Sequence, residues 1–180
     1  MANGASRRTR GFVSEDETTP FHLVSVAAAM ARHSVRYMLI GGISGMLHGM
    51  TDYRTKDVDL LIQDIAANRE RLAAAMNDLN AVPFGSGDRR TIIGDDFMRG
   101  STQWHTDAGD VAILITATGP NESIIVYADI ERDEEYIELD DGQRVPVASL
   151  DDVIRMKEAA DRYKDHLALA RPTGAAPSPW

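Results

Sequence analysis

Asp57 and Asp59 are the two side chains whose spacing is best suited to metal chemistry in this sequence. They open an apolar run that ends at Ile62, which predicts a strand buried on both faces. Because residues i and i+2 of a strand point to the same face, the two carboxylates project side by side. Adjacent carboxylates repel each other unless a cation lies between them. The pair therefore predicts a Mg²⁺ site, since Mg²⁺ prefers oxygen ligands and leaves positions for substrate phosphates.

Gly41 and Gly42 lie between an apolar strand predicted for residues 37–40 and a short helix predicted for residues 43–48. Such a turn leaves backbone N–H groups free at the start of a helix, where a triphosphate binds favourably. Ser44 would add a hydroxyl donor. The alternative is a tight turn that needs a positive φ angle. The acid pair that follows favours the phosphate-binding interpretation.

Arg54, Thr55 and Lys56 immediately precede the acid pair. The two basic side chains could contact phosphates, and the alternative is solvated loop charge. Thr55 would lie close to any bound triphosphate. All three are candidate substrate-binding residues.

Composition places the chain among globular proteins of one domain. It has 180 residues, of which 43% are hydrophobic, and no apolar run reaches the roughly 18 residues of a membrane span. The absence of cysteine excludes disulfides and thiolate metal sites and fits a reducing, cytoplasmic location. A net charge of −9 argues against a general nucleic-acid coat protein, although not against an enzyme with a local basic patch.

The pattern along the chain predicts one α/β or α+β domain at residues 21–170, between a mobile arm at residues 1–20 and a disordered tail at residues 171–180. Helix signals alternate with strand signals, which favours a mixed sheet flanked by helices. Ser149 and Asp152 form a capping-box variant that opens the last helix. Further helices are expected at 21–33, 65–79 and about 150–170, the last with or without a break, and strands at 58–62, 91–93, 102–105, 111–116, 136–139 and 144–147. The last two strands are expected to pair as a hairpin across Asp141-Gly142.

Gly41-Gly42 followed by Asp57-Val58-Asp59 resembles the polymerase-β type of the nucleotidyltransferase superfamily. The closer resemblance also includes His48-Gly49, the basic and threonine residues before the acids, and a C-terminal Lys157 followed by Arg162-Tyr163-Lys164-Asp165. This combination is similar to the AbiEii-like and MenT-like nucleotidyltransferase toxins of bacterial toxin–antitoxin systems. The resemblance covers roughly residues 35–168 and implies a nucleotidyltransferase fold, a small mixed β-sheet flanked by helices with a C-terminal helical part.

The resemblance also implies an activity. It is Mg²⁺-dependent transfer of a nucleoside monophosphate from a nucleoside triphosphate to an acceptor hydroxyl, with the tRNA 3′ end as acceptor and a cognate antitoxin as partner. Lys157 would meet the nucleotide phosphates, and Arg162 and Asp165 would orient nearby groups. The alternative for these C-terminal residues is a solvated helix with ion pairs four residues apart.

One position departs from this pattern. The relatives carry a third catalytic carboxylate on a neighbouring strand, as Gly-Asp-x-Asp-apolar-Leu, where this chain has Gly109-Asp110-Val111-Ala112-Ile113-Leu114. Ala112 therefore stands where the third acid is expected, and this form is predicted to transfer poorly. Three explanations stay open: an introduced Asp→Ala substitution, a naturally degenerate member, or substitution by Asp110, which is displaced by about 6–7 Å along the strand.

Two other functions remain possible from the sequence. One is a nucleotidyltransferase for a small cationic drug such as an aminoglycoside or lincosamide, which an acidic protein suits. The other is a degenerate, non-catalytic nucleotide-binding module. His48, His105 and His166 lack zinc-ligand spacing, and Trp104 and His105 could stack on a base, although a core position is expected for the tryptophan. A basic rim around the cleft would favour RNA over a drug; its candidates are Arg36, Arg54, Arg89, Arg90 and Arg99.

Overall fold

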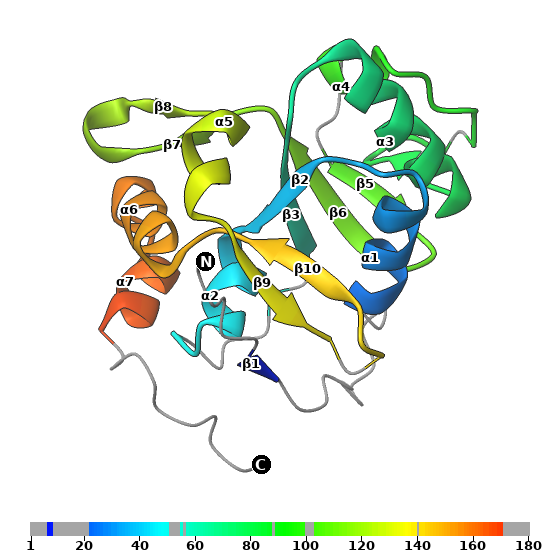
Figure 1. The fold of residues 1–180 in the computed structure, drawn as a ribbon. Coiled ribbons are helices and arrows are strands. Elements are labelled where there is room, and N and C mark those ends of the chain that lie inside the picture. The colour runs from blue at the N-terminus through cyan, green and yellow to red at the C-terminus, as the bar shows by residue number, and fades with distance from the viewer. Residues whose placement is uncertain are drawn as a thin grey trace.

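The computed structural model describes residues 7–8, 22–50, 55, 57–87, 89–99, 103–139 and 141–170. Its centre is a mixed sheet of eight strands in the order β1-β9-β10-β2-β3-β6-β5-β4 (Figure 1). The predicted mixed sheet flanked by helices is confirmed, and it has more strands than the small sheet that was expected. The strands are β1 (Arg7–Arg8), β2 (Tyr37–Ile40), β3 (Asp57–Ile62), β4 (Val82–Pro83), β5 (Gln103–Thr106), β6 (Gly109–Leu114), β9 (Glu135–Glu138) and β10 (Arg144–Val147).

The acid-bearing strand β3 lies inside the sheet, antiparallel to β2 and parallel to β6. Leu60, Leu61 and Ile62 are completely buried, and they belong to two different apolar clusters. The strand is therefore covered on both faces, as its apolar run predicts. A separate two-stranded ladder joins β7 (Ala117–Thr118) to β8 (Ile124–Ile125).

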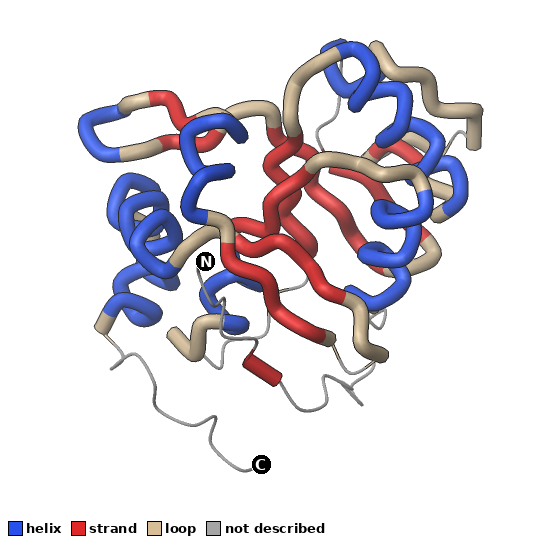
Figure 2. The backbone as a smooth tube through the Cα atoms, in the orientation of Figure 1, coloured by secondary structure: helices blue, strands red, loops and turns tan. Residues whose placement is uncertain are grey.

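Helices cover both faces of the sheet (Figure 2). Side chains of α1 and α3 pack in the larger apolar cluster, with Leu60 and Ile62 of β3. Side chains of α5, α6 and α7 pack around Leu61 on the opposite face. The helices are α1 (Leu23–Arg32), α2 (Gly41–Leu47), α3 (Ala66–Asp78), α4 (Asp96–Arg99), α5 (Tyr127–Ile130), α6 (Leu150–Ala160) and α7 (Tyr163–Leu169), with 3₁₀ turns at Pro120–Glu122 and Glu131–Asp133.

The C-terminal elements match the prediction closely. Strands β9 and β10 form the expected antiparallel hairpin. Ser149 Oγ accepts a hydrogen bond of 3.2 Å from the backbone N–H of Asp152, so the predicted cap opens α6. The expected break falls at Asp161, which has the left-handed φ angle of 47° and separates α6 from α7.

The strand predicted at residues 91–93 is wrong. Asn77 Nδ2 donates to the Ile92 carbonyl at 2.9 Å, and the Ile92 N–H donates to Asn77 Oδ1 at 2.8 Å. One side-chain amide thus pairs both backbone groups of Ile92, and these groups need no neighbouring strand. The edge strand that the sequence did not indicate is β4, next to β5.

The ends of the chain are largely outside the described residues. Arg7 and Arg8 pair in parallel with β9. The described residues leave out 1–6, 9–21 and 171–180. Most of the expected arm and the whole expected tail lie in these ranges. The mobile arm, the disordered tail and the domain boundaries at residues 21 and 170 stay predictions. Within the described part, no helix is long and apolar enough to cross a membrane.

Candidate functional site

The acid pair lies where two parallel strands present the same face. Asp57 is aligned with Asp110, and Asp59 is aligned with Ala112, across the β3–β6 pair. These four side chains share the face of Leu61, which packs with residues of α6. The structure thus places Ala112 beside Asp59, where the family resemblance implies a third carboxylate. Ala112 is 7% exposed.

The glycine turn packs directly against Asp59. Gly41 has a φ of +69°, and a Cβ atom added to it would overlap the Asp59 carboxylate. Both its backbone angle and this close approach require glycine. The Gly42 N–H donates to the Asp59 carboxylate, so one of the N–H groups expected to be free for a triphosphate is already occupied. The two glycines also form the first turn of α2 and do not precede it.

Thr55 contacts the other member of the pair. Its Oγ1 donates a 2.7 Å hydrogen bond to the carboxylate of Asp57. A Cβ atom on Gly42 would lie 2.8 Å from the Thr55 Cβ, so the turn packs against the threonine too closely for a side chain at position 42. Arg54 and Lys56, the predicted phosphate contacts on either side of Thr55, lie outside the described residues.

Asp59 is held in a position that disfavours its charged form. Burial and then the charge of Asp57 raise the pKa of Asp59 to about 6. The Gly42 N–H and the positive charges of Lys164 and Arg162 act in the opposite direction. A cation between the two aspartates would remove the repulsion, so this electrostatic strain fits a metal ion.

Lys157, Arg162 and Asp165 form one cluster beside α2. Asp165 is 1% exposed and lies 3.3 Å from Lys157 Nζ and 2.6 Å from Arg162 Nε. A Cβ on Gly45 of α2 would come within 3.0 Å of the Lys157 side chain. Lys157 and Asp165 are both buried, so the alternative of a solvated helix face is wrong for them.

The pKa of Asp165 is lowered, in contrast to that of Asp59. Burial would raise it, but the hydrogen bond from Arg162 and the charges of Arg162 and Lys157 outweigh this effect. The Asp165 charge is therefore compensated within the chain. The Asp59 charge is not compensated in this way.

The remaining predicted substrate contact, Ser44, is completely buried in α2, and its hydroxyl has no hydrogen-bond partner among the described residues. His48 is buried nearby, with Nε2 at 2.8 Å from the Ala148 carbonyl oxygen. A contact between Ser44 and a substrate would therefore require α2 to move.

Asp110 and His105 form a pair that the sequence did not predict. His105 Nδ1 lies 2.6 Å from Asp110 Oδ1, and the side chains are 48% and 42% exposed. The two residues are directly aligned across the β5–β6 pair. The signal for this contact was the two-residue Asp107-Ala108 turn between two short strands, because a hairpin centred there brings His105 opposite Asp110. Trp104, by contrast, is 1% exposed and lies in the core, as expected.

Mg²⁺ fits Asp57 and Asp59, because it commonly binds one or two carboxylates and completes its shell with water and substrate phosphates. Among the described side chains there is no group of three His, Cys, Asp or Glu residues that could hold a metal ion. The residues therefore fit one ion that a bound substrate helps to coordinate. They do not provide a closed metal cage.

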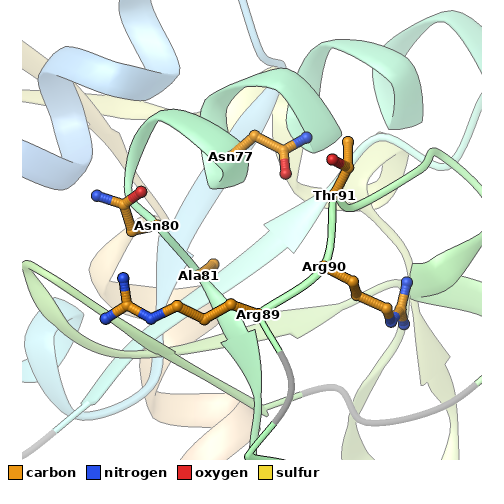
Figure 3. Close-up of a pocket in the computed structure, with 6 residues that line it drawn as sticks. All are labelled: Asn77, Asn80, Ala81, Arg89, Arg90 and Thr91. Atoms are coloured by element: carbon orange, nitrogen blue, oxygen red, sulfur yellow. The ribbon is translucent and has the colours of Figure 1, made fainter.

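Three of the five arginines expected in a basic rim lie near acids, and Arg54 is outside the described residues. Arg90 lies 2.6 Å from Asp96, and Arg36 and Arg99 lie 3.8 and 4.0 Å from Glu131 and Asp95. A hollow of about 350 Å³ lies between the end of α3 and the segment after β4 (Figure 3). None of its lining residues belongs to the acid site. They are Asn77, Asn80, Ala81, Arg89, Arg90 and Thr91.

No family model matches this chain, and no curated protein does. Among solved structures, the chain is similar to a protein from Thermotoga maritima, TM1012, described as a "putative nucleotidyltransferase". The superposition has a TM-score of 0.52 and 14% sequence identity, and it covers 82% of this chain and 87% of the other. At this identity the likeness concerns the fold. We conclude that the chain has a nucleotidyltransferase-like fold.

Proposed function

We propose that the protein is a Mg²⁺-dependent nucleotidyltransferase that transfers a nucleoside monophosphate from a nucleoside triphosphate to an acceptor hydroxyl. The observation that carries this proposal is the position of Asp59, which is half-buried beside Asp57 and packs against the Gly41–Gly42 turn. Two adjacent carboxylates, one of them with a raised pKa, support a site for a metal–nucleotide complex in a nucleotidyltransferase-like fold.

Each part of the site would have a separate task in this proposal. Asp57 and Asp59 would hold Mg²⁺, which when bound would neutralise the phosphates and polarise the α-phosphorus. Lys157 lies against α2 and would exchange part of its interaction with Asp165 for a phosphate oxygen. Arg162 would keep Asp165 oriented during this exchange, since it binds the other carboxylate oxygen.

The acceptor follows from the sequence resemblance: the tRNA 3′ end, with the protein as the toxin of a toxin–antitoxin pair and an antitoxin as its partner. The paired arginines and the net charge of −9 favour a second candidate, a small cationic acceptor such as an aminoglycoside. Ala112 beside Asp59 favours a third, a nucleotide-binding module that does not transfer.

Incubation with each α-labelled nucleoside triphosphate, Mg²⁺ and either total tRNA or aminoglycosides and lincosamides tests the proposal. We expect label to enter tRNA and this transfer to be lost in Asp57→Asn. Ala112→Asp should transfer faster than the native sequence, because it restores a metal ligand next to Asp59. Absence of transfer by both proteins to every acceptor would refute the enzyme proposal, and label entering only a drug would replace the tRNA acceptor.

A further inference from the structure

We infer that His105, held by Asp110, accepts the proton of the attacking hydroxyl, because the third carboxylate expected at position 112 is absent. This inference rests on the proposed nucleotidyltransferase function. It concerns a residue pair that the metal–nucleotide site does not otherwise use.

His105 lies on the face of the sheet that carries the acid pair. The aligned row of β5, β6 and β3 consists of His105, Asp110 and Asp57, and aligned residues share a face. Neighbouring strands are about 4.8 Å apart, so the backbone of His105 is about 10 Å from that of Asp57. Ala112 lies on this same face, diagonal to His105, and offers no carboxylate that could accept a proton.

The imidazole of His105 is held in one orientation by Asp110 and Phe84. Asp110 Oδ1 lies 2.6 Å from Nδ1, which makes Nδ1 the protonated nitrogen of the neutral ring and leaves the lone pair on Nε2. The Phe84 ring packs on the imidazole with centroids 4.3 Å apart and an angle of 31°. The ring is therefore restrained on one side by an aromatic face and at one nitrogen by a carboxylate, the arrangement of a positioned general base.

The described elements around His105 present carboxylates and apolar groups to it. From β6, Asp110 faces His105, and Asp57 lies one strand further on. From β4 and its following turn the neighbours are Val82 and Phe84, which carry no charge. Asp107, in the turn between β5 and β6, is engaged by Asn80. The charged groups that these described elements present to His105 are therefore acids.

The acceptor oxygen bonds to the α-phosphorus while its proton passes to Nε2 of His105. The bond from the α-phosphorus to the bridging oxygen breaks, and pyrophosphate leaves with that electron pair. The imidazolium then releases its proton to solvent. No oxidant or reductant is required.

His33 and Asp78 provide a matched control within the chain. They form a comparable contact of 2.8 Å between His33 Nε2 and Asp78 Oδ2. This pair links the ends of α1 and α3, which cover the opposite face of the sheet. Substitution of His33 thus removes a histidine–aspartate pair of similar chemistry without reaching the acid site.

The experiment measures single-turnover transfer from saturating Mg²⁺ and α-labelled nucleoside triphosphate to total tRNA. The test variant is His105→Asn, since an asparagine amide can still donate to Asp110 but cannot accept the proton. We expect a fall of about 10²-fold or more with unchanged binding of Mg²⁺ and a non-hydrolysable triphosphate analogue. His33→Asn should transfer like the native protein.

A further measurement separates proton transfer from a structural role. In the Ala112→Asp background, His105→Asn should reduce the rate much less than it does in the native sequence, since the new carboxylate can accept the proton. A structural role for His105 would give the same fold loss in both backgrounds.

The outcomes distinguish the two proposals. A native protein and a His105→Asn variant that transfer within about twofold of each other, while Ala112→Asp is active, would overturn the role of His105 and leave the nucleotidyltransferase function standing. An equal fold loss from His105→Asn with and without Ala112→Asp would also overturn it. If neither the native sequence nor Ala112→Asp transfers to tRNA or to a drug, both proposals fall.

Discussion

Asp59→Asn should stabilise the metal-free protein. The pKa of Asp59 is raised from 3.8 to about 6 by burial and by Asp57, so the folded state opposes the ionisation that the unfolded chain allows. At 1.36 kcal/mol for each pH unit, this difference amounts to about 3 kcal/mol. Asparagine carries no charge and keeps an oxygen that can accept the Gly42 N–H. We therefore expect an increase in unfolding free energy of up to about 3 kcal/mol at pH 7.5.

The pH dependence of this gain has a definite sign. Below about pH 4 the aspartate is protonated in both states, and Asp59→Asn should unfold like the native protein. Between about pH 4 and 6 only the unfolded chain loses the proton, so the native protein loses stability and the advantage of the variant grows. Above about pH 6 both states are ionised and the advantage stays constant.

Urea denaturation in EDTA, at several values between pH 4 and 7.5, measures this difference. Asp95→Asn is a suitable control, because its exposed side chain lies 4.0 Å from Arg99 and should change stability by no more than about 0.5 kcal/mol. Added Mg²⁺ should stabilise the native protein more than Asp59→Asn. A variant no more stable than the native protein at pH 7.5, or a gain independent of pH, would refute the electrostatic reasoning.

Three other predictions concern the Lys157–Asp165 contact, the glycine turn and the cap of α6. Asp165→Asn should lower the unfolding free energy by about 3 kcal/mol at pH 7, because it leaves the buried Lys157 charge uncompensated. Since the pKa of Asp165 is lowered, this contribution should be present above about pH 4 and disappear at lower pH. Urea melts of both proteins at several pH values measure the difference. Gly41→Ala should destabilise the protein by more than about 1 kcal/mol and abolish triphosphate binding, measured by calorimetry, because its methyl group would overlap Asp59. Ser149→Ala should cost about 1 kcal/mol in thermal unfolding through loss of the α6 cap, with triphosphate binding unchanged.

Local patterns predicted the parts of this fold that local interactions determine. The apolar run after Asp59 gave a strand buried on both faces, and Ser149 gave the start of α6. The strand expected at residues 91–93 failed because Asn77, on a distant helix, pairs the backbone groups of Ile92. No local pattern around residues 91–93 contains that partner.

The candidate site likewise contains features that local patterns predict and features that depend on tertiary contacts. The spacing of Asp57 and Asp59 was enough to place both on one face, and the motif around Ala112 was enough to place it beside Asp59. The contact between Gly42 and Asp59 required the spatial relation of β2 to β3, and that between His105 and Asp110 required the register of a hairpin. These tertiary contacts decide which groups remain available to a substrate.

The contrast between Asp59 and Asp165 separates the groups that serve the fold from those that serve a ligand. Both acids lie near α2, but Arg162 and Lys157 lower the pKa of Asp165, whereas burial and Asp57 raise that of Asp59. Replacing a compensated acid should destabilise the protein, and replacing an uncompensated one should stabilise it. An acid that weakens the fold at neutral pH requires a bound cation to offset its cost. The opposite signs expected for Asp165→Asn and Asp59→Asn thus test, without any knowledge of the acceptor, whether β3 holds a metal site.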